Sequence, residues 1–313
     1  MGVSADGWQA ASLEQFLGHG PDGNEEIELI GGAQGEGLVF GCRHMPAAGG
    51  ATSGVVICPP VLGDAAVNYQ REARLGRWLA RAGVACQRFH YRGTGDSDRV
   101  DGGMSFASLV ADARRATDEL RERCGIERIG FLGTRIGALV AARVAADFDG
   151  APLAVWQPVV DPRRFVEDSV RVDSGRHGLA AAPPGLGALP VGFEGPPAPA
   201  ATPAWSLHDV PLGRDLFDPS VIDNLVDAAG RRPRPILLVQ LHRRVGLAPE
   251  YRAAAGRWQA RGFSVDVAYD PTEDDWWEVH PGWRPSDEVL SATSSWLPAR
   301  LAPGGNTIWE GST

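Results

Sequence analysis

The sequence predicts an α/β fold with a mostly parallel, doubly wound sheet, and three observations support this. Short apolar runs alternate with segments of helical periodicity between about residues 53 and 157, and again between about residues 236 and 297. A glycine-joined hairpin pattern precedes the first run. Two glycines, Gly133 and Gly137, flank a turn between an apolar strand and a helix of small residues. Alternating strands and helices form parallel sheets, because each helix returns the chain to the start of the next strand.

Periodicity and turn residues justify each element in chain order. Residues 26–31 and 37–43 alternate between apolar and polar side chains across a glycine-rich turn, which predicts an antiparallel hairpin. Residues 53–58 form an apolar run that Pro59 and Pro60 stop, as is typical of a buried strand. The remaining predicted strands are 84–91, 129–132, 153–157, 236–240 and 264–269, and the predicted helices are 67–82, 107–123, 136–146, 165–172, 249–261 and 286–297.

Composition divides the chain into a core and three other parts. Residues 178–204 are rich in glycine, proline and alanine, and they interrupt the pattern between the sixth and seventh strands. We expect an inserted cap there, although composition alone equally allows an excursion without a role. The predicted parts are an N-terminal extension (1–25), the core (26–160 and 233–301), the cap insertion (161–232) and a C-terminal tail (302–313).

Composition also excludes several classes of function. The chain has 313 residues and a net charge of −9, so no basic surface favours nucleic acid or an anionic membrane. All 30 basic residues are arginine, which excludes lysine Schiff-base chemistry. The sequence shows no signal-peptide pattern and no apolar run of membrane-spanning length, so we expect a cytoplasmic protein. No CxxC pair occurs among the four cysteines, so we expect reduced thiols, no metal site and no cofactor.

Several motifs give the chain a family resemblance. They are Val-Val-Ile-Cys-Pro-Pro at 55–60, Asn-Tyr-Gln-Arg at 68–71, Arg-Phe-His-Tyr-Arg-Gly-Thr-Gly-Asp-Ser at 88–97, Gly-Thr-Arg-Ile-Gly-Ala at 133–138 and Trp-Gln-Pro-Val-Val at 156–160. With these motifs the chain resembles the α/β-hydrolase superfamily and is most similar to the exosortase A system-associated hydrolases. The resemblance covers most of residues 53–172. It implies the α/β-hydrolase fold with an inserted cap, and only loosely an association with exopolysaccharide or cell-surface gene systems.

Arginine replaces the expected nucleophile. α/β-Hydrolases carry Gly-x-Ser-x-Gly at a tight strand-to-helix turn, the nucleophile elbow, and this chain has Arg135 at the central position. A guanidinium stays protonated in proteins and cannot attack a carbonyl. By the same alignment, Arg244 takes the place of the catalytic acid and Asp275 that of the histidine, with His280 five residues later. The resemblance therefore implies that the Ser-His-acid triad is lost.

The arginine at the elbow needs a negative partner. Arg135 precedes a helix, whose N-terminal end already carries partial positive charge. One interpretation is a structural ion pair with the acidic loop that contains Glu273, Asp274 and Asp275. The other is a bound carboxylate, phosphate or sulfate, held with the help of Arg244. The first is slightly favoured, because arginines more often pair with protein carboxylates than with ligands.

Further candidate binding groups surround the elbow. The backbone N–H groups of Val61 and Ile136 correspond to an oxyanion hole, and without a nucleophile they would bind a carbonyl, an anion or only water. Trp276 and Trp277 are expected near the mouth of the site, where they would stack on a ligand or close the base of the cap.

Three functional hypotheses follow. The first is a catalytically inactive hydrolase-like protein, a binding or accessory protein with an anion-compatible pocket for a small molecule or a protein partner. The second is a non-hydrolytic enzyme of a biosynthetic pathway, a lyase, cyclase, isomerase or transferase. There Arg135 and Arg244 would hold an anionic group while Asp275 or His280 moves a proton. The third is a hydrolase with a relocated nucleophile. Fold alone does not decide among them.

Overall fold

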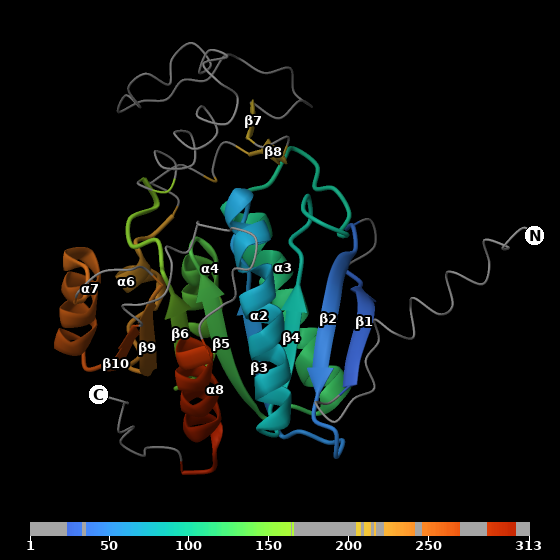
Figure 1. The fold of residues 1–313 in the computed structure, drawn as a ribbon. Helices are drawn as coiled ribbons and strands as arrows, with labels where there is room; N and C mark the ends of the chain where they lie inside the picture. The colour runs from blue at the N-terminus through green and yellow to red at the C-terminus, as the bar shows by residue number, and fades with distance from the viewer. Residues whose placement is uncertain are drawn as a thin grey trace, which may run out of the picture.

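An eight-stranded sheet with strand order β1-β2-β4-β3-β5-β6-β9-β10 forms the centre of the computed structural model (Figure 1). β1 pairs antiparallel with β2, and β2 pairs antiparallel with β4. All other neighbours in this sheet are parallel. The structure describes residues 24–32, 36–163, 165, 205–207, 210–213, 216, 222–241, 246–269 and 287–304. The sheet strands are β1 (Asn24–Ile30), β2 (Val39–Met45), β3 (Ser53–Cys58), β4 (Ala85–Phe89), β5 (Arg128–Thr134), β6 (Leu153–Trp156), β9 (Pro235–Gln240) and β10 (Ser264–Tyr269).

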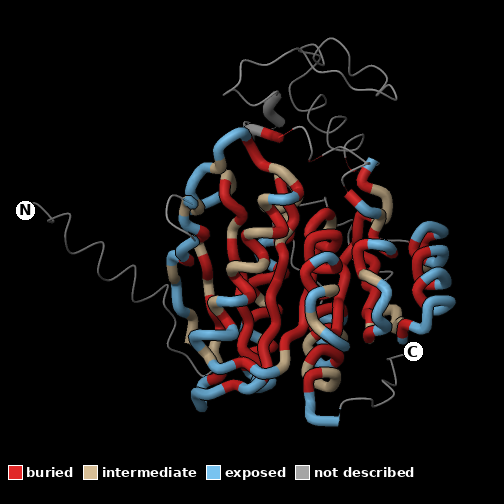
Figure 2. Tube along the Cα trace, turned by 180° about the vertical axis from the view of Figure 1, so that it is seen from behind, coloured by how far each residue is buried: buried red, intermediate tan, exposed pale blue. Residues whose placement is uncertain are grey.

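Helices cover both faces of the sheet, as a doubly wound arrangement requires (Figure 1). One apolar cluster joins alternate strand residues to α2 and α8, and a second joins the other strand residues to α3, α4, α6 and α7. The central strands β3, β5 and β6 are buried except at Arg128, the first residue of β5 (Figure 2). The helices are α2 (Gly63–Arg81), α3 (Phe106–Cys124), α4 (Gly137–Ala145), α6 (Leu225–Ala228), α7 (Pro249–Ala260) and α8 (Asp287–Leu301).

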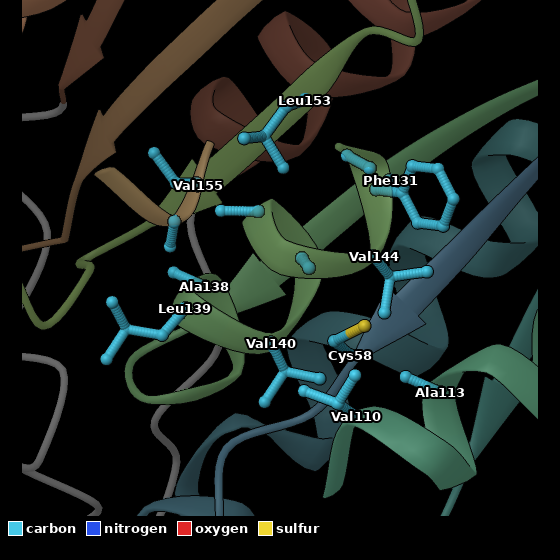
Figure 3. Close-up of a cluster of buried hydrophobic side chains, with 14 of the residues drawn as sticks. Cys58, Val110, Ala113, Phe131, Ala138, Leu139, Val140, Val144, Leu153 and Val155 are labelled. Carbon is cyan, nitrogen blue, oxygen red and sulfur yellow. The ribbon is translucent and has the colours of Figure 1, made fainter. Parts of the chain in front are cut away.

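The side chains of β3 show why its sequence is apolar from Val55 to Cys58. Val55 and Ile57 belong to the cluster under α2 and α8, whereas Val56 and Cys58 belong to the cluster on the opposite face. Successive residues of a strand point to opposite faces, so a strand covered on both sides must be apolar at every position. Figure 3 shows the second cluster, where Cys58 lies beside the small and branched side chains of α4.

Local sequence signals fix the ends of several helices. Ser105 and Ser108 form a reciprocal capping box at the start of α3, and Gly125 ends that helix in the left-handed conformation. Pro249 occupies the first turn of α7, where its missing N–H costs no helical hydrogen bond.

Two predicted helix boundaries are wrong. The helix expected at 67–82 begins four residues earlier, at Gly63, directly after the loop that follows the two prolines. The helix expected at 286–297 continues through Pro298 to Leu301. Leu297 and Leu301 are buried on the same apolar cluster, and this packing outweighs the helix-breaking tendency of the proline.

The segment 161–232, predicted to be a cap insertion, is described only in part. β7 (Trp205–Leu207) pairs antiparallel with β8 (Val210–Leu212). Met104 bridges to Leu212, which ties this hairpin to the loop before α3. Of the helix predicted at 165–172 only Phe165 is described, and residues 1–23 and 305–313 also lie outside the described part. No helix in the described part is long and apolar enough to cross a membrane.

Candidate functional site

The turn between β5 and α4 has the tight geometry predicted for residues 133–137. Arg135 has a φ of 55°, in the left-handed region. A Cβ on Gly133 would collide with the backbone of Gly137 and Ala138, and a Cβ on Gly137 would collide with the carbonyl oxygens of Cys58 and Pro59. Both glycines are therefore required, because β5, α4 and the loop after β3 approach one another at their backbones.

Backbone strain is concentrated at this end of the sheet. Within the described residues, three non-glycine residues have a positive φ: Leu62 (60°), Arg135 (55°) and Gln157 (42°). They follow the carboxyl ends of β3, β5 and β6, which are neighbouring strands. Each such conformation costs about 1 kcal/mol or more and persists only when the surroundings impose it. Clustered strain of this kind is typical of functional sites in open α/β sheets, where ligands bind beyond the carboxyl ends of the strands.

Hydrogen bonds to the segment after β6 hold the strained turn. The Arg135 N–H donates to the carbonyl oxygen of Trp156 at 3.0 Å, and the Arg135 carbonyl accepts from the N–H of Val159 at 3.2 Å. The side-chain Oε1 of Gln157 accepts from the Leu241 N–H at 2.7 Å, which attaches the same segment to the end of β9. Three strand ends are thus linked around Arg135.

The Arg135 guanidinium turns toward α2. Its Nε donates to Oδ2 of Asp64 at 3.2 Å, and its Nη1 donates to the carbonyl oxygen of Gln157 at 3.2 Å. The Arg135 side chain is 11% exposed and that of Asp64 is 20% exposed. Asp64 lies in the first turn of α2, where a carboxylate is also favoured by the helix dipole. This carboxylate offsets the unfavourable position of a cation at the start of α4.

An acidic partner for Arg135 was predicted, but Asp64 was not. Arg135 and Asp64 are 71 positions apart, and no sequence spacing connects them. The available signal was an aspartate directly after the Pro-Pro loop, at the edge where all parallel strands end. The predicted partners Asp274 and Asp275 lie outside the described residues. The other predicted site residues outside the described part are Arg244, Trp276, Trp277 and His280.

Val61 and Ile136 carry the two backbone donors predicted beside the elbow. Neither N–H group has a hydrogen-bond acceptor among the described residues. The side chains of both residues are fully buried. The loop carrying Val61 passes directly beside the start of α4, because a Cβ on Gly137 would collide with Pro59. Both N–H groups therefore remain available as donors within the described part of the chain.

Buried titratable groups lie behind and beside the turn. Burial raises the pKa of Glu72, on α2, to about 7, although the adjacent Thr134 hydroxyl and the charges of Arg88 and Arg71 oppose the shift. Burial also raises the pKa of Tyr251, on α7, against the opposing charge of Arg135. In the described part of the chain, no group of three or more histidine, cysteine, aspartate or glutamate side chains is arranged to hold a metal ion.

The cysteines agree with the predicted reduced state. All four are free, and Cys58 and Cys86 are buried in the core strands. Burial raises the pKa of both thiols, so neither provides a thiolate near neutral pH.

Comparisons with known proteins identify the fold. No family model matches the chain, and no curated protein matches its sequence. Among solved structures, Est1E from Butyrivibrio proteoclasticus superposes with a TM-score of 0.60 at 14% identity, covering 88% of this chain and 99% of that one. A hyperthermophilic esterase from Pyrobaculum calidifontis gives a TM-score of 0.55 at 15% identity, covering 94% of this chain and 92% of the esterase.

A third solved structure agrees with these two. An alpha-beta serine hydrolase homologue from Coxiella burnetii gives a TM-score of 0.51 at 16% identity, covering 88% of this chain and 97% of that one. At such identities the likeness establishes the fold alone. The chain therefore has the α/β-hydrolase fold, as the sequence predicts, and is related in structure to esterases.

Proposed function

We propose that this protein has lost serine-hydrolase activity and is a binding or accessory protein. At the elbow it binds a small ligand with a carbonyl or carboxylate group, or the same group on a protein partner. The observation that carries the proposal is Arg135, which has a left-handed backbone at the turn after β5 and a guanidinium held by Asp64. The motif alignment assigns this residue to the position of the nucleophile. Arginine provides no nucleophile at this point of the fold.

The polar groups around the turn support an oxygen-bearing ligand. The N–H groups of Val61 and Ile136 lack acceptors among the described residues and suit one ligand oxygen. The Arg135 guanidinium supplies the positive charge that favours a carboxylate over an amide or ester. Because Asp64 partly neutralises this charge, we expect modest affinity for simple anions.

Labelling tests the loss of hydrolase chemistry. A serine-directed fluorophosphonate probe should leave the wild-type protein unlabelled, while a serine esterase treated in parallel is labelled. Labelling of the wild-type chain would establish a relocated nucleophile and overturn the proposal.

Ligand-induced thermal stabilisation tests the binding role. A panel of small carboxylates should include ferulic acid, which is bound to Est1E in a solved structure. The increase in melting temperature caused by a bound carboxylate should be lost in Arg135→Ala. It should be retained in Arg143→Ala, which removes a half-exposed arginine of α4 paired with Asp147. If Arg135→Ala lowers stability but keeps the full ligand-induced increase in melting temperature, the arginine only forms an ion pair with Asp64 and does not bind the ligand.

A non-hydrolytic enzyme is the alternative function. It would require Asp275 or His280 to move a proton, and both lie outside the described residues. Conversion of a bound carboxylate or ester to a new product, followed by mass spectrometry, would favour this alternative over a binding protein.

A further inference from the structure

A buried polar cluster lies on the α2 face of the sheet, directly behind the elbow. Glu72 is 3% exposed, and its Oε1 has no hydrogen-bond partner within the described residues. The same holds for Nε of Arg88 and Oγ1 of Thr134, both of them buried. An unsatisfied buried polar atom costs about 1–3 kcal/mol, so three in one region demand a reason beyond packing.

The cluster is connected to Arg135 from two sides. Thr134, whose hydroxyl interacts with Glu72, is the last residue of β5 and directly precedes Arg135. Asp64, which holds the Arg135 guanidinium, lies on α2 about two turns before Glu72. Glu72 therefore contacts the backbone neighbour of Arg135 and shares a helix with its carboxylate partner.

The charge of Glu72 is balanced by groups from each element packed around it. Burial raises its pKa to about 7, opposed by the Thr134 hydroxyl and the guanidiniums of Arg88 and Arg71. Cys58, Cys86 and Tyr91, on β3, on β4 and just after β4, lie within electrostatic range of the carboxylate, and burial keeps all three protonated near neutral pH. Elsewhere on α2, His44 of β2 packs against Gly76, and Asp287 of α8 binds Arg74.

We propose that Glu72 is a positioning residue whose proton controls how the elbow holds Arg135. Among the described residues, the oxygens Glu72 Oε1 and Thr134 Oγ1 are both without a hydrogen-bond partner, and a neutral Glu72 carboxyl group places no charge beside Thr134. When the proton leaves to solvent, the carboxylate attracts the Thr134 hydroxyl as a donor and attracts the Arg88 guanidinium. This change alters the restraint on β5 immediately before Arg135 and adds a negative charge behind the site. A carboxylate ligand therefore binds more weakly once Glu72 is ionised, a consequence that rests on the proposed function.

Arginine side-chain NMR tests the inference without any ligand. In protein labelled with ¹⁵N-arginine, the Nε resonance of Arg135 is identified by its absence from the spectrum of Arg135→Ala. Between pH 5.5 and 8.5 this resonance should shift with a midpoint near 7 in the wild type. The shift should disappear in Glu72→Gln. It should persist in Glu127→Gln, which alters an exposed carboxylate just before β5, at the far end from Thr134.

A second variant keeps the test decisive if Glu72→Gln does not fold. Thr134→Val removes the hydroxyl that lowers the pKa of Glu72 and links its charge to β5, so the shift of the Arg135 resonance should become smaller and its midpoint should move to higher pH. An Arg135 resonance that is constant over this pH range, or that responds identically in Glu72→Gln, overturns the inference.

Ligand binding separates this inference from the proposed function. Titration with ferulic acid at pH 6 and pH 8 should give several-fold weaker binding at pH 8 in the wild type, and equal binding at both values in Glu72→Gln. If ferulic acid and the other carboxylates bind at neither pH while the Arg135 resonance still titrates through Glu72, the proposed function fails and the positioning role stands. If ferulic acid binds with equal affinity at pH 6 and pH 8 in both the wild type and Glu72→Gln, the positioning role alone is overturned.

Discussion

Arg135 combines three unfavourable features, each of which the fold offsets. Its backbone is left-handed, its charge lies at a helix N-terminus, and its side chain is nearly buried. Hydrogen bonds to the segment after β6 impose the backbone conformation, and Asp64 supplies the compensating charge. Backbone strain that the surroundings impose is typical of functional sites, which is why we propose the function at this turn.

The two glycines around Arg135 give the first residue-scale prediction. Gly133→Ala or Gly137→Ala should destabilise the protein by at least about 3 kcal/mol or prevent folding, because the new methyl group meets backbone atoms. Gly256→Ala is the matched control, since a Cβ at this exposed position of α7 meets nothing within 4 Å. We expect the control to gain about 0.5–1 kcal/mol from better helix propensity. Urea unfolding measures all three variants; equal stabilities would contradict the close backbone approach.

Glu72 gives the second residue-scale prediction, on pH dependence. Its folded-state pKa of about 7 lies above the ordinary value of 4.5, so the folded protein binds this proton more tightly than the unfolded chain. The resulting stabilisation is complete below pH 4.5 and is lost as the pH rises through 7. Relative to Glu72→Gln, the wild type should therefore lose about 3 kcal/mol of unfolding free energy between these pH values. The unfolding free energy of both proteins is measured as a function of pH. If it changes equally in the two proteins, Glu72 does not titrate in this range.

At the scale of elements, helix ends determine which residues reach the site. α2 begins at Gly63, so its first turn places Asp64 beside Arg135. A start at residue 67, as the apolar periodicity suggests, would have left this aspartate in a loop. α4 begins directly after Ile136, which leaves that N–H group outside the helical hydrogen-bond ladder.

The capping box of α3 provides the element-scale prediction. Ser105→Ala removes the side chain that accepts from the Ser108 N–H at 3.0 Å, so stability should fall by about 1 kcal/mol. Ser295→Ala, in an exposed position of α8, should change it by less than about 0.5 kcal/mol. Denaturant titration of both variants checks the difference; an unchanged Ser105→Ala protein would show that the box contributes nothing.

At the scale of the whole molecule, the last helix completes the core that the earlier elements leave open. α8 covers strands formed far earlier in the chain, including β3, β5 and β6. The indole Nε1 of Trp156 donates to Oγ1 of Thr293 at 3.0 Å, and both side chains are fully buried. This hydrogen bond joins the strand that precedes Gln157, and hence the elbow, to the C-terminal helix.

Removal of that long-range bond gives the whole-molecule prediction. Thr293→Val keeps the shape of the side chain but leaves the buried indole N–H without an acceptor, which should cost about 1–3 kcal/mol. Thr117→Val is the matched control, because that buried hydroxyl donates only to the helix carbonyl of Ala113. The control should cost less than about 0.5 kcal/mol. Chemical denaturation distinguishes the two, and equal costs would remove the special role of the Trp156 bond.

The order of strands and helices could be predicted from the sequence because local patterns encode it. Residues 55–58 are apolar at every position, as a strand covered on two faces requires, and helices 107–123 and 249–261 show periodic apolar faces. The glycines at 133 and 137 predict the tight turn because no other residue fits there. Boundaries were predicted less well, since α8 passes through Pro298 only because tertiary packing holds Leu301.

The candidate site, like the fold, could be predicted only in part from the sequence. The sequence by itself determined that Arg135 stands at a glycine-flanked turn and that a cation there needs a negative partner, because these depend on residue type and neighbours along the chain. Only the tertiary structure decided that Asp64 is this partner, that Gln157 shares the strain, and that Glu72 lies buried behind Thr134. Those contacts join strand ends and helices far apart in sequence, and the parallel sheet brings them together by aligning the carboxyl ends of its strands at one edge.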